Sequence, residues 1–266
     1  MRRYHFFEFC DQSWIPNFIR IGYMNNLNLI QKTFCPYQNV PALLLEWADE
    51  NAINEFCDLA SGGGEQISVL LEKSVKEFNL KFKLTDLYPQ IKSYQDLQKK
   101  YGVSKIIYDT ESISIFNLPK GEKNFTIFSA FHHFDKYQAE LIISDIATNY
   151  NSICIFEFTS RSLKDLLSMI PAIFFNWISP FLSKKKSLTT IIFGFLIPII
   201  PILVVFDGVI SVLRSYKMEE IEKMIPPELK NNFKIKYGTL PWGKIPFAKM
   251  NYFLMVRVQT NPEVKN

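Results

Sequence analysis

The sequence has few cysteines and histidines, and neither residue type is clustered in a way that suits a metal. Its 266 residues include four cysteines and three histidines, and no two cysteines form a Cys-x-x-Cys pair. A zinc site needs ligands at short spacings and a disulfide framework needs paired cysteines, so we expect no metal site and no disulfides. Scattered free cysteines are typical of a reducing cytoplasm, and we expect a cytoplasmic protein.

Concentrated positive charge is also missing. The net charge is only +4, and the one tight basic run, three lysines at residues 184–186, lies between apolar stretches. Nucleic-acid-binding proteins carry a basic stripe or patch, so we expect no nucleic-acid partner. The first residues lack the long apolar run and small-residue cleavage site of a signal peptide.

The order of the apolar segments predicts an α/β fold. Strands are expected at residues 55–60, 81–86, 105–108, 125–130 and 153–158, and helices at 65–76, 91–101 and 136–148. Alternating strands and helices indicate a mostly parallel sheet with helices on both faces. Residues 233–237 and 252–258 have no long helix between them and are expected to close the sheet as an antiparallel pair.

We expect one domain over residues 1–266, in four parts. They are an N-terminal helical cap at 1–50, a core at 51–161, an apolar helical insertion at 162–230 and the closing strands at 231–266. Within the cap, prolines at positions 16, 36 and 41 predict several short helices.

A glycine-rich turn follows the first predicted strand. Residues 58–64 read Asp-Leu-Ala-Ser-Gly-Gly-Gly, and Glu65 follows at once. Glycines let a ligand approach the main chain closely, as at the first turn of dinucleotide-binding folds. Glu65 would repel a pyrophosphate, so a ligand with an amino-acid moiety fits better, with Asp58 facing its ammonium. Ala60 stands where the first glycine of such turns is usual, and we expect it to adopt an ordinary φ.

A second acid lies at the end of the next predicted strand. Asp86 comes about twenty residues after the turn, where a carboxylate can accept hydrogen bonds from both hydroxyls of a ribose. Leu87 and Tyr88 could pack against an adenine ring. The alternative is a purely structural turn followed by a surface aspartate.

These segments resemble those of the class I S-adenosylmethionine-dependent methyltransferases. Residues 56–65 resemble their motif I, Thr85-Asp86 their acidic second motif, and residues 128–134 the fourth-strand motif of the small-molecule branch. The resemblance implies a Rossmann-like seven-stranded sheet with the last strand antiparallel, S-adenosylmethionine as cofactor, and in-line methyl transfer from sulfonium. The cofactor-binding residues it implies are Asp58, Ala60, Gly62, Gly63, Gly64, Asp86, Leu87, Ser129 and Phe131.

Departures from the pattern occur after the third strand, at residues 109–114, and before the fifth, where residues 149–152 replace the usual glycine pair.

Two histidines are the candidates for acid–base chemistry. Methyl transfer needs mainly proximity, and a base is required only when the acceptor is a hydroxyl or an ammonium. His132 and His133 follow the fourth predicted strand and could act as catalytic base. Alternatively they cap the next helix or hold the loop. Weaker pocket candidates are Asp11, Trp14, Arg20, Asp207, Arg214 and Tyr216.

A long apolar segment precedes the closing strands. Residues 166–183 and 187–206 carry no charge, and each approaches the length of a membrane span. A single crossing would separate the last strands from their sheet, and prolines at 171, 180, 198 and 201 are expected to break the helices. We therefore favour a hairpin at the membrane surface, with the lysines 184–186 at anionic headgroups, over a soluble lid or dimer contact.

Three functions remain open. The first is methyl transfer from S-adenosylmethionine to a small, apolar or lipid-like acceptor. The second is a non-catalytic membrane-associated or scaffolding protein on a degenerate methyltransferase fold, which Ala60 and the poor third motif would favour. A nicotinamide-dependent reductase is disfavoured by Glu65 and by the lack of a suitable Tyr-x-x-x-Lys pair.

Overall fold

The computed structural model describes residues 1–258 except 13, 74–78, 119–120, 183–190 and 246. Its internal contacts divide the chain into two compact units. The helical unit comprises Met1–Asn39, Glu157–Lys217 and Pro241–Met250, and the sheet unit comprises Val40–Phe156, Met218–Leu240 and Asn251–Asn266. The single domain of residues 1–266, with its four parts, stays a prediction.

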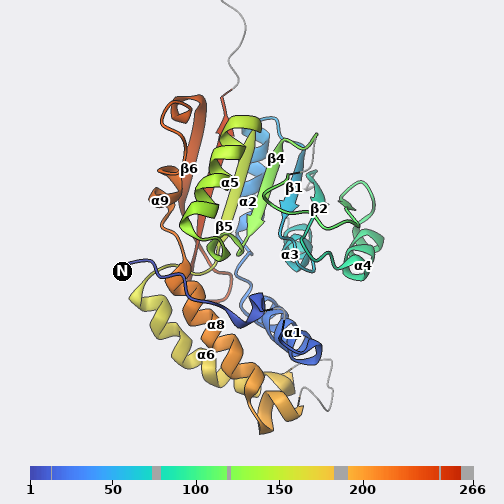
Figure 1. Ribbon diagram of the computed structural model, residues 1–266. Helices are drawn as coiled ribbons and strands as arrows, with labels where there is room; N and C mark the ends of the chain where they lie inside the picture. Colours follow the sequence, from blue (N-terminus) through green and yellow to red (C-terminus); the bar gives the residue numbers. More distant parts are fainter. Residues whose placement is uncertain (13, 74–78, 119–120, 183–190, 246, 259–266) are drawn as a thin grey trace, which may run out of the picture. The chain divides into compact units, whose positions relative to one another are not determined.

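The sheet has seven strands in the order β3-β2-β1-β4-β5-β7-β6. Their bounds are β1 Glu55–Leu59, β2 Lys81–Leu84, β3 Ile106–Tyr108, β4 Asn124–Phe128, β5 Ser152–Glu157, β6 Phe233–Pro241 and β7 Lys249–Arg257. The first five strands pair in parallel, and the closing pair is antiparallel (Figure 1). The predicted fold class is confirmed.

The central parallel strands are covered on both faces, because the helices that connect them pack on the sheet. All six residues of β5 are buried, as are the last four of β1. Such strands form near-continuous apolar runs that can be buried only between two layers of helices.

Helices cover both faces of the sheet (Figure 1). They are α2 Val40–Glu50, α3 Glu65–Lys73, α4 Ile91–Tyr101, α5 Lys136–Asn149 and α9 Met218–Glu222, with a short 3-10 turn, η4, at Lys230–Asn232. α2 packs with α3, and α5 packs with α9. The predicted helix at 91–101 is confirmed at both ends, and residues 74–76 of the predicted helix at 65–76 lie outside the described residues.

The start of α5 shows whether His132 or His133 caps this helix. Asp135 is the N-cap of this helix: its carboxylate accepts from the N–H of Gln138, whose side chain accepts from the N–H of Asp135. This reciprocal capping box is complete without a histidine. The expectation that His132 or His133 caps the helix is therefore wrong.

The strand order reverses between β1 and β4, which are neighbours in the sheet. The chain leaves β1 towards β2 and β3 in one direction, and later runs from β4 to β5 in the other. The loops that follow β1 and β4 diverge at such a point, so the carboxyl ends of these strands are where α/β sheets bind ligands.

The helical unit consists of three long helices with short turns. Its elements are η1 Phe9–Asp11, α1 Asn17–Phe34, α6 Leu163–Leu182, the π-helix η3 Ile192–Leu196 and α8 Ile199–Arg214. α8 packs against both α6 and α1. The short helices predicted near the N-terminus are partly wrong: α1 runs unbroken for 18 residues, because Pro16 is its N-cap and does not interrupt it.

Three of the four prolines in the apolar segment do not break a helix as expected. The fourth, Pro198, is the N-cap of α8 and lies at the predicted kind of break, between η3 and α8. Pro171 and Pro180 lie inside the continuous 20-residue α6. Each removes one main-chain hydrogen bond, a cost of about 3 kcal/mol that packing against neighbouring helices can offset. Pro201 lies in the first turn of α8, where its missing N–H would have no helical partner anyway.

Candidate active site

The turn after β1 uses three left-handed residues. Ala60, Gly62 and Gly64 have φ values of 54°, 55° and 77°. The expectation of an ordinary φ at Ala60 is therefore wrong, because the chain has to turn at this position whichever residue fills it. A Cβ makes this conformation cost roughly 1–2 kcal/mol, which the surrounding contacts offset.

The two glycines serve different purposes. A Cβ on Gly64 would lie 2.6 Å from Leu97 Cδ1 and 3.1 Å from Leu84 Cδ1, so this glycine lets the turn pack against the core. A Cβ on Gly62 would have no atom within 4 Å. The main chain at Gly62 therefore borders open space, which a ligand could use.

Hydrogen bonds hold the turn in a single shape. The Gly64 N–H donates to the Ser61 carbonyl at 2.8 Å, and the Ser61 N–H donates to the Thr85 carbonyl at 3.0 Å. The side chain of Ser93, on α4, donates to the Gly63 carbonyl at 2.7 Å. The site is thus organised before any ligand arrives.

Asp58, at the end of β1, is fully buried beneath this turn. Thr126 Oγ1 of β4 donates to its carboxylate at 2.6 Å, and Gln66 Nε2 of α3 donates at 3.3 Å. Burial raises the pKa of Asp58 to about 7, against the lowering effect of the hydrogen bonds from Thr126, Ser61 and Gln66. Its charge therefore responds to pH near neutrality and to any cation bound nearby.

Asp86 ties the turn to the end of β2. One of its carboxylate oxygens accepts from the Gly62 N–H at 2.8 Å, and the other accepts from the Tyr88 N–H at 2.7 Å. Each oxygen keeps a second lone pair, and the side chain is half-buried. Asp86 can therefore hold the turn and still accept hydrogen bonds from a ligand.

The segment after β3 lies beside Asp86. The Ile113 N–H donates to the Asp86 carbonyl at 2.9 Å, and Ser112 Oγ donates to the Leu87 carbonyl at 2.7 Å. Residues 109–114, which lacked a clear match in sequence, therefore reach the same edge of the sheet. Leu87 and Tyr88 are exposed there, and their contact with adenine stays a prediction.

The residues after β4 form a tight 3-10 turn. Ser129 has a φ of 47° and donates its N–H to the Phe156 carbonyl of β5 at 2.7 Å. The turn η2 spans Phe131–His133, in which Phe131 and His132 are buried and His133 is half-buried. Phe131 is fully buried, so its contact with a cofactor stays a prediction, and His133 is the more accessible histidine.

Sequence reasoning missed Thr126 and Gln66. The available signal was a lone hydroxyl residue in the apolar strand Phe125-Thr126-Ile127, because a buried polar side chain needs a partner.

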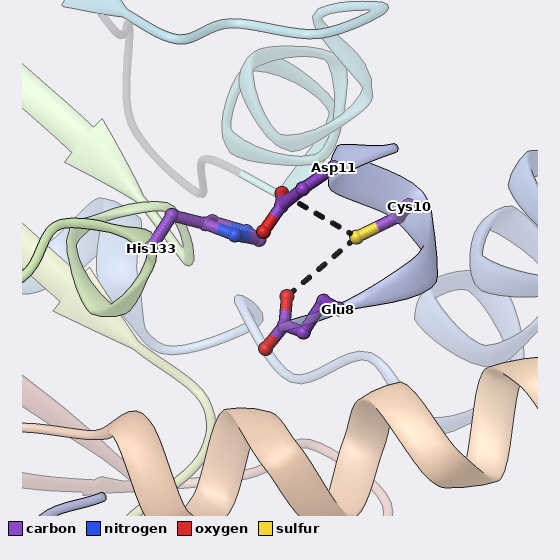
Figure 2. A group of neighbouring side chains, drawn as sticks. All are labelled: Glu8, Cys10, Asp11 and His133. Carbon is purple, nitrogen blue, oxygen red and sulfur yellow. Dashed lines mark hydrogen bonds between the residues drawn. The ribbon is translucent and has the colours of Figure 1, made fainter. Parts of the chain in front are cut away.

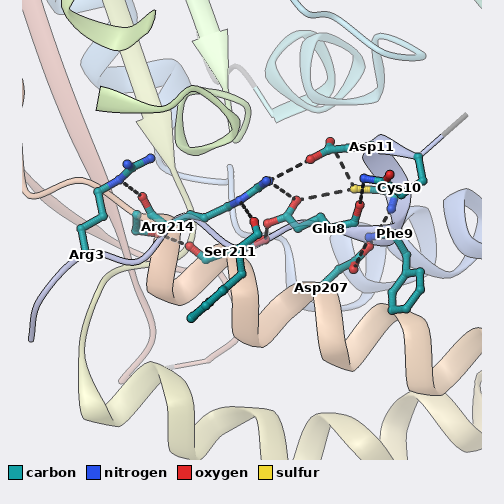
Figure 3. A network of polar contacts seen from close by, with 11 residues as sticks. Arg3, Glu8, Phe9, Cys10, Asp11, Asp207, Ser211 and Arg214 are labelled. Atoms are coloured by element: carbon teal, nitrogen blue, oxygen red, sulfur yellow. Dashed lines mark hydrogen bonds and ion pairs between the residues drawn. The ribbon is translucent and has the colours of Figure 1, made fainter. Parts of the chain in front are cut away.

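A second polar cluster, in the helical unit, fastens the N-terminal segment to α8 (Figure 3). Asp207 accepts from the N–H groups of Phe9 and Cys10 at 2.8 and 2.9 Å. One turn further along α8, Ser211 Oγ donates to Glu8 at 2.9 Å. Arg214 pairs with Asp11 at 2.9 Å and with Glu8 at 3.3 Å.

This cluster includes most of the weaker pocket candidates. Asp11, Asp207 and Arg214 belong to it, and Arg20 donates to the Cys10 carbonyl at 2.9 Å. Trp14 is exposed, and the Arg3 guanidinium lies 3.8 Å from the centre of the Tyr216 ring. A pocket role for these six residues stays a prediction; what the contacts show is a structural clamp.

Cys10 lies between two acids of the clamp (Figure 2). Its Sγ lies 3.6 Å from Glu8 and 3.8 Å from Asp11. Burial, followed by the charges of Glu8, Asp11 and Asp207, raises the pKa of this thiol far above its usual value. Cys10 is therefore held as a neutral thiol rather than a reactive thiolate.

Comparisons with known proteins identify the fold. No protein-family model and no curated protein matches the sequence. Among solved structures, a plantazolicin methyltransferase in complex with SAH matches with a TM-score of 0.56 and 13% identity, over 94% of both chains. An O-methyltransferase from neocarzinostatin biosynthesis, in complex with S-adenosylmethionine and 2-hydroxy-5-methyl naphthoic acid, matches with a TM-score of 0.51 and 14% identity. That match covers 91% of this chain and 59% of the longer enzyme. The chain thus has the fold of the class I S-adenosylmethionine-dependent methyltransferases.

The pKa of Asp58 predicts a pH-dependent stability. Because folding raises this pKa from 3.8 to about 7, the folded state favours the protonated acid. Its stabilising contribution is complete below pH 3.8 and is lost as the pH rises to about 7. The loss is on the order of 4 kcal/mol, from about 1.4 kcal/mol per pH unit. Asp58→Asn should not show this loss. In urea denaturation, the free energy of unfolding of the variant relative to that of wild type should therefore rise between pH 4.5 and 8. The exposed Asp96→Asn should leave the pH profile of the wild type unchanged, and a flat difference for Asp58→Asn would contradict the assignment.

The clamp predicts a large effect at Arg214. Arg214 and Glu8 are both buried, and removing one partner of a buried pair leaves an uncompensated charge. Arg214→Met should lower the free energy of unfolding by about 3–5 kcal/mol, measured by urea denaturation. Adding Glu8→Gln to Arg214→Met should restore part of that loss. If the free energy of unfolding of Arg214→Met lay within about 1 kcal/mol of the wild-type value, the Arg214–Glu8 pair would not be needed for stability.

Proposed function

We propose that this protein transfers a methyl group from S-adenosylmethionine to a small apolar or lipid-like acceptor. The observation that carries the proposal is the arrangement at the switch point of the sheet. There an open main chain at Gly62 lies above the buried Asp58 and beside Asp86.

The residues present suit this cofactor. S-adenosylmethionine has an ammonium group, a ribose with two hydroxyls and no phosphate. Asp58 would place negative charge below the ammonium, and Asp86 would accept from the ribose. The main chain of residues 60–64 would border the ligand, with Leu87 towards the adenine and Ser129 at the end of β4. Glu65 lies in the first turn of α3, where its negative charge stabilises the helix. The same charge would repel a pyrophosphate.

Methyl transfer from this cofactor needs few catalytic groups from the protein. When bound, the cofactor supplies a methyl group already activated by its sulfonium. The chain's own residues would bind and orient the two reactants, which supplies most of the rate enhancement. For a hydroxyl acceptor, we propose His133 as the general base, because it is half-buried whereas His132 is buried.

The non-catalytic alternative loses its two supports. Ala60 adopts the left-handed conformation that a glycine would have. Residues 109–114 reach Asp86 and Leu87 despite their unfamiliar sequence. Neither departure therefore indicates a degenerate site.

Helix α6 favours contact of the helical unit with an apolar environment. Of the described helices, it alone is long and apolar enough to cross a membrane, yet only 17% of its most apolar 18-residue stretch is buried. An equally long and apolar helix in the core of a soluble protein would be mostly buried. In α6 the large apolar residues are exposed at spacings of three and four, forming an outward stripe of Leu167, Ile170, Phe174, Ile178 and Phe181.

The inner side of α6 is polar or small. Its buried residues are Asn176, Ser179 and Pro180, and Asn26 of α1 donates to Ser179 Oγ at 2.9 Å. Gly22 lets α1 approach the side chain of Ile200. Small residues and polar bridges inside, with large apolar residues outside, are typical of helices that pack within lipid. We therefore propose that residues 166–206 contact a membrane surface. The lysines 184–186, assigned to headgroups, lie outside the described residues.

A groove lined by residues of α6 and α8 offers room for a hydrocarbon chain. It has a volume of about 370 Å³, and its lining includes Ile173, Trp177 and Phe206. The indole N–H of Trp177 donates to the Phe195 carbonyl at 3.1 Å, so it presents no unsatisfied donor. The size lies within the range of small-molecule sites.

Cofactor binding tests the central proposal. Isothermal titration should show wild-type protein binding S-adenosylmethionine. Asp86→Ala should weaken binding at least tenfold, because it removes acceptors for two ribose hydroxyls. The exposed Asp96→Ala is the matched control and should bind normally. Absence of binding by the folded wild type would overturn the proposal. Incubation of a lipid extract with isotopically labelled cofactor would then identify the acceptor by its mass.

Vesicle flotation tests the membrane contact. Wild-type protein should float with vesicles that contain anionic lipid, whereas Ile170→Glu/Phe174→Glu should stay at the bottom because each glutamate must be desolvated. Tyr137→Glu changes an equally exposed aromatic residue on α5 and should still float. Wild-type protein at the bottom of the gradient would contradict the contact.

A further inference from the structure

Tyr94 is an unusual residue in its helix. It is the only buried residue of α4, whose other residues are mostly polar. Its ring lies 5.8 Å from the ring of Tyr108, and its Cδ1 would lie 3.9 Å from a Cβ on Gly64. Together with Ser93, Tyr94 places α4 directly against the glycine turn.

The hydroxyl of Tyr94 is fully buried, and its hydrogen has no acceptor among the described residues. Phenylalanine would pack equally well without leaving a polar group unpaired, so packing alone does not account for a tyrosine here. An unpaired polar group beside a ligand site calls for an explanation in terms of the ligand.

The pKa of the Tyr94 phenol indicates which charged groups act on it. Burial raises the pKa of Tyr94, and the next largest effects are those of the carboxylates of Asp86 and Asp58. The main chain of Gln90 lowers the pKa, as an N–H directed at the phenolic oxygen would. The unmet requirement is therefore an acceptor for the hydroxyl hydrogen, and Asp86 is the carboxylate with the strongest influence.

We propose that Tyr94 is a positioning residue, whose hydroxyl donates to the Asp86 carboxylate when ribose hydroxyls bind to it. The inference rests on the proposed function. Among the residues that the structure describes, the donors to the Asp86 carboxylate are two main-chain N–H groups, those of Gly62 and Tyr88. A third donor on the buried side would hold the carboxylate in place against two new donors from the ligand. Because the hydroxyl is buried, it acts through Asp86 and not on the cofactor itself.

Substitution by phenylalanine separates this role from a structural one. Tyr94→Phe should leave the melting temperature of the ligand-free protein equal or higher, because an unpaired buried hydroxyl is lost. It should nevertheless raise the Kd for S-adenosylmethionine roughly tenfold, as expected for a hydrogen bond to a charged group. Tyr108→Phe, in the neighbouring half-buried ring, should change neither quantity.

A double-mutant cycle tests the route through Asp86. In an Asp86→Asn background, Tyr94→Phe should have little further effect on the Kd. An undiminished effect in that background, an unchanged Kd for the single variant, or a lowered melting temperature would each overturn the inference. Failure of the wild type to bind would instead overturn the proposed function, so the two failures are distinguishable.

Discussion

The hydrogen bond from Thr126 to Asp58 joins β4 to β1 at the point where the order of the sheet reverses. Asp58 also binds β2, because its carbonyl accepts from the N–H and the hydroxyl of Thr85 at 3.0 and 2.9 Å. One buried residue thus connects three neighbouring strands. Its buried carboxylate needs hydrogen-bond donors from the protein. Gln66 is one of these donors, and its contact with Asp58 fixes the position of the first turn of α3. The shape of the glycine turn follows from this constraint.

Much of the sheet unit could be read from local patterns. The helix at 91–101 was predicted at both ends, since its polar and apolar residues alternate with a helical period. The turn at 58–64 and the acid at Asp86 were recognisable because glycines and a strand-end carboxylate stand at short, regular spacings. Strand ends were less accurate: β6 continues to Pro241, four residues beyond the predicted Tyr237, because pairing with β7 extends it.

Other features depend on partners distant in sequence. Thr126 meets Asp58 across 68 positions, and nothing local reveals that pairing. The φ of Ala60 is imposed by the path from β1 to α3 and not by alanine's own preference. The length and apolarity of α6 were evident, but the side facing outward was not, because Ser179 meets its partner Asn26 of α1 only when the helices assemble. Local propensity was outweighed in each case by tertiary contacts.

The clamp on α8 has a consequence for the order in which the chain folds. Glu8 and Ser211 are separated by 203 positions. At about 5–20 residues per second, a ribosome needs roughly 10–40 seconds to add that much chain. Throughout synthesis of the sheet strands, this segment therefore lacks its binding surface, and the side chain of Glu8, buried in the folded protein, stays exposed. A segment made before α8 is thus secured only after α8 exists, and nascent chains would be most open to chaperones or lipid during that interval.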